Sequence, residues 1–596
     1  MIQLSDYVID SLVNKGIKDI FLVSGGGIMF LCDAVGRNKK IKYISNHHEQ
    51  ASATAAEAWA RTKNHISACL VTTGPGGTNA ITGVAGAWVD SIPMIVISGQ
   101  VKRSVTADYT KYRQVGPQEI NIIPMIKPIT KYAVTIIDPN KIKYELEKCF
   151  YEATSGRPGP VWIDLPLDIQ SAVIDEKKLD SFEPPKKVIN KNDLMSSVKK
   201  VVEMLKISKK PIVIAGQGIR LSGGQKVFER LVGKLRTPVI FPINGLDLLP
   251  ENNKYVLGKF GPVGTRQGNF ALQNSDLLIS IGASLNAAST GYDFKGFGRN
   301  AKKIMINIDQ GEIDNKKIKI DFPIVADAKD FMEELLRQTK NINLISNKKW
   351  LSVCKYFKNK YPLINQEYFK DKKHVNSYVF FDVLSDLLTS KDVLVTGISL
   401  DACSMYQAFK VKKGQRAFVN KNLGQMGWCL PAAIGACAGN NYKRTILVTG
   451  DGSIQFNIHE LETIKYYKLP IKIFVFNNQG YESIRSTQDN YFSSNYVGSN
   501  KDSGVSNPNF KLLAQAHDFK YEEIKNNDQL VDIIKKTLKT KDPVLCEVNI
   551  AYDQKRMPRV SSFRLPDGTL ESRPLEDMFP FLPKEEIDEN MHLFDK

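Results

Sequence analysis

The segment from 445 to 481 constrains the fold of this chain more than any other part of the sequence. The β-branched run 445–449 predicts a buried strand, residues 458–467 predict a helix, and 471–476 predict the next strand. Together they make one βαβ crossover, whose two strands run parallel in a single sheet. Gly450-Asp451-Gly452 follows the first strand, and Asn477-Asn478-Gln479-Gly480-Tyr481 follows the second, 24 residues later (453 to 476). Both loops are therefore expected at the same edge of the sheet.

These two loops carry oxygen ligands that suit a magnesium–diphosphate site. Mg²⁺ takes a near-octahedral shell of hard oxygens, and the Asp451 carboxylate, the Asn478 carboxamide and the Gly480 carbonyl fit three of its positions. Gly452 and Ser453 open the next helix, where free N–H groups and the positive end of the helix dipole favour a diphosphate. A Gly-Asp-Gly turn alone also occurs in ordinary βα loops. The Asn-Asn pair that returns at the next strand is what indicates a cofactor.

This pairing resembles the signature of enzymes that use thiamine diphosphate, which also need a glutamate far away in sequence. Glu49 is the candidate, because it lies between a strand ending at 43–45 and an alanine-rich helix over 51–61. Asn46 and Glu49 also fit a capping box, a purely structural alternative. The surrounding motifs favour the cofactor role: 48–51 (HEQA), 55–61 (AAEAWAR), 73–79 (TGPGGTN), 90–94 (DSIPM) and 98–100 (SGQ). Their succession resembles the N-terminal domain of acetolactate synthases and their carboligase relatives.

The resemblance to acetolactate synthases continues over nearly the whole chain, through 423–428 (LGQMGW) and 430–436 (LPAAIGA). It implies an α/β fold of three doubly wound parallel-sheet domains, of the thiamine diphosphate-dependent decarboxylase and carboligase type. It implies that Glu49 acts on the pyrimidine of the cofactor as the acid–base group, and that Met426 wedges the cofactor into a V shape. The residues expected to bind the cofactor are Gly26, Pro75, Asn79, Gly397, Gln425, Met426, Asp451, Gly452, Ser453, Asn478, Gly480 and Tyr481.

Three positions depart from the family pattern. Ser24 stands before the Gly25-Gly26-Gly27 turn, where the family usually has proline. Pro117 replaces the phenylalanine before the Gln118-Glu119 pair, in which Gln118 is the candidate for orienting substrate. Thr487 replaces a tryptophan that lines the acceptor pocket. With Gly27, Pro117, Ile484 and Thr487 as its expected lining, this substrate pocket is predicted to be different or roomier than in the family.

The resemblance implies a thiamine diphosphate- and Mg²⁺-dependent enzyme that decarboxylates a 2-keto acid, with pyruvate as the default. The two-carbon unit then joins a second carbonyl compound, as in acetolactate formation. Two alternatives stay open at this point. One is a carboligase that adds the two-carbon unit to a keto sugar nucleotide, and the other is a flavin-coupled 2-keto acid oxidase.

The middle of the chain leaves FAD undecided. Gly216-Gln217-Gly218 follows a predicted strand, but Leu221 occupies the third glycine position of a dinucleotide fingerprint. In acetolactate synthases this domain binds FAD partly through arginines after a Gly-Ala element. Here Gly282-Ala283 is followed by 284–288 (SLNAA), which contains no arginine, although Asp309 resembles a retained position.

Strand and helix patterns predict three domains. The N-terminal domain, 1–174, would bind the pyrimidine and is followed by a linker over 175–192. A central α/β domain spans 193–339, and a second linker spans 340–372. The C-terminal domain, 373–556, would bind the diphosphate and Mg²⁺. An irregular tail, 557–596, is expected to cover a site.

Composition limits the remaining function classes. No apolar run approaches the roughly 20 residues of a membrane span, and the N-terminus lacks a signal-peptide pattern. The eight cysteines contain no Cys-x-x-Cys pair, which favours a reducing cytoplasm. The formal charge is +18, but lysine-rich stretches such as 199–210 and 370–373 show no nucleic-acid motif. A soluble enzyme of small molecules is expected and, by resemblance, a homodimer or homotetramer in which Glu49 of one subunit meets Asp451 of another.

Overall fold

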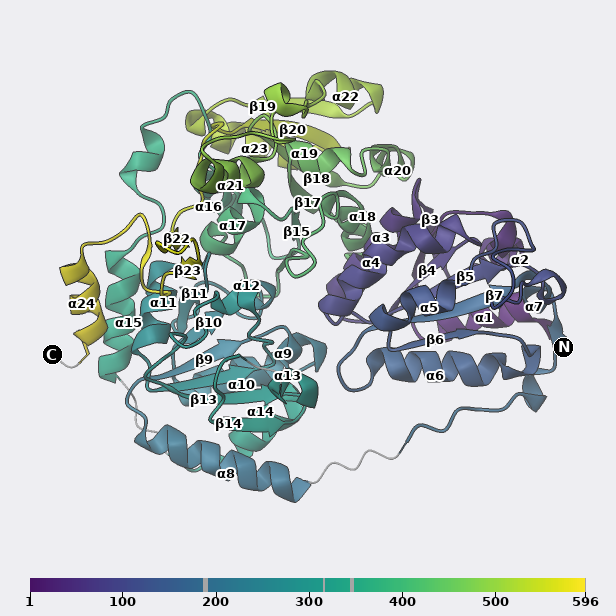
Figure 1. Ribbon diagram of the computed structural model, residues 1–596, viewed down its shortest axis with the longest axis horizontal. Helices are drawn as coiled ribbons and strands as arrows, with labels where there is room; N and C mark the ends of the chain where they lie inside the picture. Colours follow the sequence, from purple (N-terminus) through teal and green to yellow (C-terminus); the bar gives the residue numbers. More distant parts are fainter. Residues whose placement is uncertain (186–190, 315–316, 343–347, 595–596) are drawn as a thin grey trace.

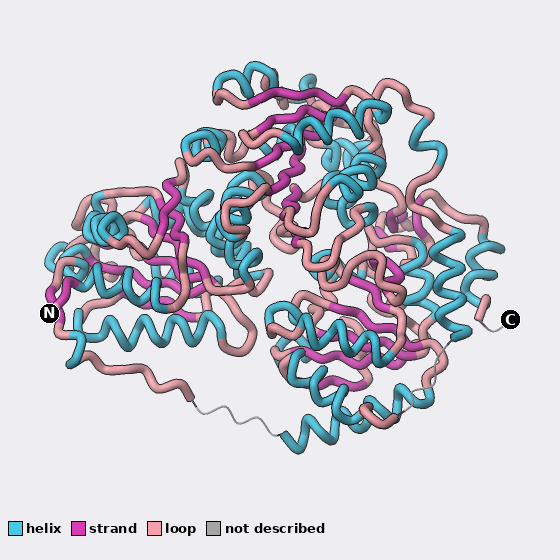
Figure 2. Tube along the Cα trace, turned by 180° about the vertical axis from the view of Figure 1, so that it is seen from behind, coloured by secondary structure: helices cyan, strands magenta, loops and turns pink. Residues whose placement is uncertain are grey.

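The computed structural model describes residues 1–185, 191–314, 317–342 and 348–594. Within these ranges the chain folds into three parallel six-stranded sheets flanked by helices, and a C-terminal segment of short strands and one helix (Figure 1, Figure 2). The predicted α/β fold with three doubly wound sheets is therefore confirmed. Parts of both predicted linkers, 186–190 and 343–347, lie outside the described residues.

The first sheet lies at the N-terminal side of the molecule. Its strand order is β3 (Lys42–Ser45), β2 (Asp19–Leu22), β4 (Ser67–Val71), β5 (Met94–Gln100), β7 (Pro160–Pro166) and β6 (Tyr132–Thr135). Its helices are α1 (Leu4–Asn14), α2 (Met29–Arg37), α3 (Glu49–Lys63), α4 (Pro75–Val89), α5 (Ile122–Ile126), α6 (Ile142–Thr154) and α7 (Leu167–Gln170). A short antiparallel pair, β1 (Ile2–Gln3) with β8 (Val173–Ile174), closes the domain.

The middle sheet is also parallel but has a different strand order, in which three consecutive strands run to each edge. Its order is β11 (Val256–Lys259), β10 (Val239–Phe241), β9 (Pro211–Ala215), β12 (Leu277–Ile281), β13 (Lys302–Asn307) and β14 (Phe322–Val325). The apolar runs 239–241 and 277–281 predict strands from the sequence, and β10 and β12 have these bounds. Its helices are α8 (Lys191–Ile207), α9 (Gly218–Leu221), α10 (Gln225–Leu235), α11 (Arg266–Asn274), α12 (Ala287–Thr290), α13 (Gln310–Asp314), α14 (Ala328–Gln338) and α15 (Lys348–Lys360).

The third sheet contains the βαβ unit predicted from 445–481. Its order is β16 (Arg416–Phe418), β15 (Val393–Thr396), β17 (Thr445–Gly450), β18 (Ile471–Asn477), β20 (Val544–Asn549) and β19 (Lys520–Ile524). The helix predicted over 458–467 is α20 (Glu460–Tyr466), and a separate short helix, α19 (Asp451–Gln455), precedes it. The other helices are α16 (Ser377–Leu387), α17 (Leu400–Ala408), α18 (Cys429–Gly439), α21 (Glu482–Phe492), α22 (Phe510–Ala516) and α23 (Leu530–Lys539).

The first and third sheets share one strand order and the middle sheet has another, but in each of the three the direction of the chain across the sheet reverses at one point. The chain moves to one side after β2, β9 and β15, and to the other side after β4, β12 and β17. Loops at the carboxyl ends of such neighbouring strands diverge and open a crevice, the usual ligand site of a doubly wound sheet. The sequence motifs lie at these crevices: 24–27 and 72–75, 216–218 and 282–285, and 397–399 and 450–453.

The first and third domains are held together by helices α3 and α18, which lie side by side (Figure 1). The backbones approach so closely that a Cβ on Gly435 would lie 1.9 Å from the carbonyl oxygen of Ala55. A buried charge network lies beside this contact: Arg61 pairs with Glu57 and Asp90 of its own domain. Glu57 also accepts a hydrogen bond of 2.6 Å from Nε1 of Trp428, directly before α18, so the network connects the two helices.

The C-terminal tail is ordered, so the prediction of an irregular tail is wrong. Strand β21 (Arg559–Val560) pairs with β24 (Met578–Phe579), and β22 (Ser562–Arg564) pairs with β23 (Leu570–Ser572). Helix α24 (Lys584–His592) lies beside α11 and α15 on the middle domain (Figure 1). None of the described helices is both long and apolar enough to cross a membrane.

Candidate active site

Asp451 connects the two loops that the sequence predicts to meet. Its side chain is 1% exposed, at the start of α19, directly after β17. Oδ2 accepts hydrogen bonds from the backbone N–H groups of Asn478 (3.1 Å) and Gly480 (2.9 Å), and Oδ1 accepts one from Gly452 (2.7 Å). The side chain of Asn507 also donates to Oδ2, at 2.6 Å. The three candidate metal ligands are therefore adjacent at one sheet edge.

Burial controls the electrostatics of this carboxylate. Loss of water around Asp451 raises its pKa, and the four N–H donors oppose that rise. Among the described residues, the side chain makes no ion pair with Lys, Arg or His. A buried carboxylate that is hydrogen-bonded but has no cationic partner is well suited to a bound metal ion.

The turn that follows β18 depends on unusual backbone conformations. Gln479 has φ 61° and Gly480 has φ 122°. A Cβ at Gly480 would lie 2.6 Å from the carbonyl oxygen of Ser499, so only glycine fits. The carbonyl oxygen of Gly480 accepts a hydrogen bond from the N–H of Glu482 at 3.1 Å and keeps a second lone pair. Arg485 on α21 stabilises the turn by donating a hydrogen bond of 2.9 Å to the Asn478 carbonyl.

Close packing shapes the space beside Asp451. The ring of Tyr481 lies against Gly452, where a Cβ would come within 2.2 Å of it. Oγ of Ser453 accepts a hydrogen bond of 3.0 Å from the N–H of Gly427, and so connects α19 to the loop that precedes α18. Met426 is in that loop, half-buried between Gly424 (φ 68°) and Gly427 (φ 82°).

Gln425 and the loop after β15 present polar atoms that have no hydrogen-bond partner within the described ranges of the chain. Oε1 of Gln425 is buried without a hydrogen bond, and its Nε2 lies 3.5 Å from Oγ1 of Thr54 on α3. Gly397 is buried and donates its N–H to the Val448 carbonyl at 3.0 Å. Beside it, Oδ2 of Asp401 is also buried without a partner. These orphaned oxygens lie at the crevice of the third sheet.

Asp401 is a site residue that the sequence analysis missed. Its Oδ2 would lie 2.2 Å from a Cβ at Gly397, and its Oδ1 accepts N–H bonds from Ser399 and Ala402, both at 2.9 Å. Burial raises the pKa of Asp401 to about 6. The signal available in the sequence was an acidic residue in the first turn of a helix that follows a strand-end glycine.

Glu49 and Asn79 form a second group on the first domain. Glu49 is the first residue of α3 and is half-buried, and its Oε2 accepts a hydrogen bond of 3.0 Å from Nδ2 of Asn79 on α4. Pro75 is the first residue of α4. Asn46 does not cap α3: His48 is the cap, with its Nδ1 accepting from the N–H of Gln50 at 3.1 Å. The alternative of a capping box between Asn46 and Glu49 is therefore wrong.

Asn46 is used between domains instead. It donates a hydrogen bond of 2.8 Å to Glu460 on α20, and Glu460 also accepts from the N–H of His47 at 2.8 Å. The segment before Glu49 is thus attached to the third domain. Among the described residues, no hydrogen bond directly joins Glu49 or Asn79 to Asp451.

The glycine turn after β2 approaches the loop after β4. Gly27 donates its N–H to Oγ1 of Thr72 at 3.1 Å, and a Cβ on Gly27 would lie 2.0 Å from Oγ1 of Thr73. Gly26 has open space where a Cβ would be. The loop that carries Pro117 and Gln118 contacts the same crevice through backbone.

Gln118 is exposed with φ 60°, and its carbonyl oxygen would lie 2.1 Å from a Cβ on Gly74. Pro117 is exposed as well. The neighbouring Glu119 is buried and accepts hydrogen bonds from Tyr109 (3.0 Å) and from the N–H groups of Val115 (2.8 Å) and Gly116 (2.9 Å). Burial would raise the pKa of Glu119, but these bonds, together with one from Ala107, lower it. Glu119 therefore fixes the loop, leaving the Gln118 side chain at the surface.

Ile484 and Thr487 lie on α21, one to two turns after the metal-loop residues. Ile484 is 45% exposed, and Thr487 is exposed and donates its hydroxyl to the Ser483 carbonyl at 3.0 Å. Thr487 also lines a cavity of about 650 Å³ between α21 and the C-terminal tail. Ser483 contacts Ser399 through their hydroxyls, which connects α21 to the Gly397 loop.

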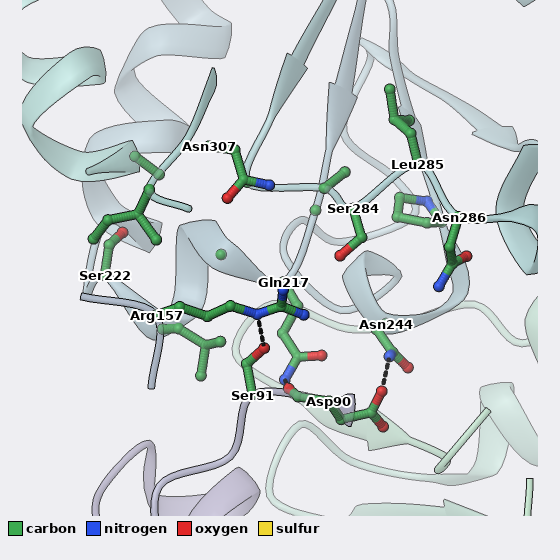
Figure 3. A pocket seen from close by; sticks show the side chains of 18 of the residues that line it. Asp90, Ser91, Arg157, Gln217, Ser222, Asn244, Ser284, Leu285, Asn286 and Asn307 are labelled. Carbon is green, nitrogen blue, oxygen red and sulfur yellow. Dashed lines mark hydrogen bonds between the residues drawn. The ribbon is translucent and has the colours of Figure 1, made fainter. Parts of the chain in front are cut away.

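A separate cavity of about 300 Å³ lies at the crevice of the middle sheet, where the first domain covers it (Figure 3). Its floor is the glycine-rich backbone of 216–218 and 282–283. Arg157 reaches it from the first domain and donates to Ser91 at 2.8 Å. The same arginine pairs with Asp309 (3.1 Å) and Glu312 (2.8 Å). Asn244, on the middle domain, donates to Asp90 at 3.3 Å.

Comparison with protein families gives three matches in chain order. The family described as "Thiamine pyrophosphate enzyme, N-terminal TPP binding domain" matches residues 2–125. The central domain of the same enzymes matches 198–335, and the C-terminal TPP binding domain matches 401–548. These ranges contain Glu49, the glycine-rich floor of the middle-sheet cavity and the Asp451 loops respectively.

Among curated proteins, the chain is similar to large subunits of acetolactate synthase. It is 32% identical to that of Cyanidium caldarium over 565 residues, covering 93% of this chain and 94% of the relative. It is 30% identical to that of Lactococcus lactis subsp. lactis, with 93% and 94% covered. Acetolactate synthase 2, chloroplastic, of Nicotiana tabacum is 30% identical, with 94% and 83% covered.

Proposed function

The chain belongs to the acetolactate synthase large-subunit family of thiamine pyrophosphate enzymes, and from this premise we propose that it decarboxylates a 2-keto acid, with pyruvate as the default, in a Mg²⁺-dependent reaction. The two-carbon unit that remains is joined to a second carbonyl compound. The bond between the carboxylate and the keto carbon breaks, CO₂ leaves, and a new carbon–carbon bond forms to the acceptor. The acceptor oxygen takes up one proton and becomes a hydroxyl.

The single observation that carries this proposal is the hydrogen bonding of Asp451 to the N–H groups of Asn478 and Gly480. It brings one carboxylate, one carboxamide and one backbone carbonyl together, a donor set that fits Mg²⁺. Ser453 and Gly452 then lie at a helix start, suited to a diphosphate. The buried, unpartnered oxygens of Gln425 and Asp401 add acceptors for the donor groups of a bound cofactor.

When bound, thiamine diphosphate supplies the nucleophile that attacks the keto carbon and the electron sink that permits loss of CO₂. Among the residues of this chain, Glu49 is the proposed acid–base group. Asn79 keeps Oε2 of Glu49 oriented, so that the other carboxylate oxygen is available to hold a proton against the cofactor. Met426 supplies an apolar contact between two glycines that allow a sharp approach.

This chain differs from the family at two residues that are expected to line the acceptor site. Thr487 and Pro117 replace two bulky aromatic side chains of the family pattern, and Thr487 lines a cavity of about 650 Å³. Acetolactate formation remains the default by kinship, and Gln118 is proposed to orient substrate in that reaction. The open cavity favours a larger acceptor as the second candidate, and a keto sugar nucleotide belongs to that class.

FAD fits the middle-sheet cavity poorly. Arg157 is the one cationic side chain among the described residues that line this cavity, and it is already paired with Asp309 and Glu312. The diphosphate of FAD would have to compete with two carboxylates for it. No step of the proposed reaction therefore uses a flavin. The visible absorbance of the purified protein decides whether a flavin-coupled oxidase stays under consideration.

Two further proposals concern the setting of the reaction. Kinship with the family supports a homodimer or homotetramer, in which Glu49 of one subunit faces Asp451 of another. A fully active monomer in sizing experiments would contradict it. All eight cysteines are free thiols, seven of them buried, which supports a cytoplasmic location.

The experiment that tests the function is product identification. Purified protein is incubated with ¹³C-labelled pyruvate, thiamine diphosphate and Mg²⁺, alone and with a panel of acceptor aldehydes and ketones, and the products are identified by mass. We expect a product that contains the labelled two-carbon unit and an intact acceptor. Oxygen consumption with acetate as the labelled product would instead support the oxidase.

A further inference from the structure

A groove between α21 and the C-terminal tail is larger than a small keto acid needs. It encloses about 650 Å³ and is bounded by one face of α21 and by tail residues between 552 and 581. We call it the tail groove. Pockets of this size, within the usual range of roughly 300 to 1,000 Å³, hold ligands of drug or nucleotide size. A small 2-keto acid would leave most of the tail groove empty.

Two cations of the tail groove lack a carboxylate partner within the described part of the chain. Nε of Arg559 is buried and has no hydrogen-bond partner, and Lys555 makes no ion pair but lies 5.7 Å from the ring centre of Phe579. Arg573 pairs with Asp577 at 2.6 Å, and Asp489 accepts from the hydroxyls of Ser494 and Tyr496. The carboxylates of Glu482 and Asp553 line the groove as well.

Leaving Arg559 without an anionic partner is energetically unfavourable. Burial lowers its pKa and the neighbouring Arg556 lowers it further, while the Glu482 carboxylate opposes the shift. A half-buried arginine whose Nε has no acceptor among the described residues is stabilised by an anionic ligand, and its planar donors suit phosphate oxygens. Together with Lys555 it gives the groove two positive groups for one ligand.

The same groove presents flat aromatic faces. The rings of Tyr491, Tyr552, Phe563, Phe579 and Phe581 line it. Arg485 already stacks on Tyr552, and Arg573 lies over Phe563 and Phe581, so Tyr491 and Phe579 are the candidates for stacking on a flat ligand. Cations beside aromatic rings are the combination that recognises a phosphate group joined to a heterocyclic base.

The tail groove is directly connected to the candidate active site. Arg485, which lines the groove, donates to the Asn478 carbonyl at 2.9 Å and to the Tyr552 carbonyl at 2.8 Å, and stacks on the Tyr552 ring. Thr487 and Glu482 line the groove from the helix that starts directly after the metal loop. A ligand in the tail groove therefore lies next to the loop proposed to hold Mg²⁺, with Arg485 between them.

From these contacts we infer that the tail groove binds the acceptor substrate, and that this acceptor is a carbonyl compound linked to a nucleoside diphosphate. The phosphates pair with Arg559 and Lys555, the base stacks on the aromatic rings, and the carbonyl end points along α21 toward the metal loop. The inference rests on the proposed carboligation, and it adds the chemical class of the second substrate. The diphosphate takes no part in the bond changes, since only the acceptor carbonyl gains a carbon–carbon bond and a proton.

Binding measurements test the inference separately from catalysis. Enzyme saturated with thiamine diphosphate and Mg²⁺ is titrated in a calorimeter with UDP, CDP, ADP, GDP and dTDP, and with inorganic pyrophosphate. We expect at least one nucleoside diphosphate to bind more tightly than pyrophosphate. Arg559→Gln and Lys555→Gln should each weaken it by about tenfold or more, as expected for loss of a hydrogen bond to a charged group.

Two variants serve as matched controls. Arg564→Gln removes an exposed arginine of the same tail that does not line the groove and should leave binding unchanged. Arg157→Gln alters the middle-sheet cavity instead. If Arg559→Gln does not fold, the exposed Lys555 carries the test.

The inference is overturned if no nucleoside diphosphate binds, or if binding is lost in Arg157→Gln while both groove variants bind as the wild type does. CO₂ release from pyruvate is measured in parallel. Its absence would reject the proposed function, whereas CO₂ release without any nucleotide binding would reject the acceptor inference alone.

Discussion

Glu49 and Asn79 are joined across two helices: Nδ2 of Asn79 donates a hydrogen bond of 3.0 Å to Oε2 of Glu49. The two residues begin or nearly begin α3 and α4, which follow different strands of the first sheet. The bond fixes one oxygen of a half-buried carboxylate. Glu49 is thereby held in one orientation, as an acid–base group must be.

Glu49→Gln should keep the fold and lose most turnover. An amide keeps an oxygen for the Asn79 bond but cannot exchange a proton, and loss of an acid–base group costs on the order of 10² to 10⁴ in rate. CO₂ release from pyruvate measures the loss. Glu203→Gln, an exposed change on α8, is the matched control. Activity of Glu49→Gln near that of the control would remove Glu49 from the mechanism.

Asp451→Ala should abolish stabilisation by Mg²⁺ and thiamine diphosphate. The change removes the proposed metal carboxylate and leaves buried N–H groups of Gly452, Asn478 and Gly480 without their acceptor, at about 1 to 3 kcal/mol each. Thermal melting with and without both ligands measures the effect. Asp532→Ala, at an exposed position of α23, should keep the full ligand-induced rise. An equal rise in Asp451→Ala would refute the assignment.

Asp164 should make stability depend on pH. It is buried in β7 and accepts from Ser98 (2.6 Å), Thr135 (3.1 Å) and Gln100 (3.3 Å), and burial raises its pKa from 3.8 to about 7. Because the folded chain holds this proton more tightly than the unfolded chain, the stabilisation is complete below pH 3.8. It then falls by about 1.4 kcal/mol per pH unit until pH passes about 7.

Asp164→Asn removes that titration. The difference in Tm between the variant and the wild type should therefore shift in favour of the variant as pH rises from 4 to 8. Melting curves at several pH values measure it, with Asp532→Asn as the exposed control. A Tm difference that is constant over this range would show that the carboxyl does not titrate there.

Thr487→Trp should narrow the range of acceptors. A tryptophan at this position of α21 would fill part of the tail groove, and one methylene of acceptor size is worth only about 1 to 3 kcal/mol in an apolar pocket. Competition between pyruvate, 2-ketobutyrate and a larger carbonyl compound, scored by product ratio, measures the change. Lys535→Trp, at an exposed position of α23, is the control. An unchanged ratio would mean that Thr487 does not contact the acceptor.

Much of this fold could be predicted from the sequence because it is locally encoded. Apolar runs gave β10 and β12 their observed bounds, and the spacing from Gly450 to Asn478 predicted a contact that Asp451 makes. The β strands are parallel and buried, so each reads as a short continuous apolar run. Loop motifs at the ends of such strands must meet at one edge of the sheet.

The errors concern contacts between distant segments. Asn46 fits a capping box by local spacing, but its side chain bonds to Glu460, 414 residues away. The tail was predicted to be irregular because strands of two or three residues carry no periodicity. Helix α24, with few apolar residues, depends on packing beside α11 and α15. Asp401 was not recognised as a candidate site residue from the sequence, because what distinguishes its side chain is burial next to Gly397 in the folded chain.

The most direct test of the account is CO₂ release from [1-¹³C]pyruvate by the purified protein, with thiamine diphosphate and Mg²⁺ supplied together and each omitted in turn after chelation and dialysis. The account predicts labelled CO₂ only when both are present, because Asp451, Asn478 and Gly480 are proposed to hold the diphosphate through the metal. Release that persists without Mg²⁺ or without thiamine diphosphate, or no release with pyruvate and other 2-keto acids when both are present, would contradict it.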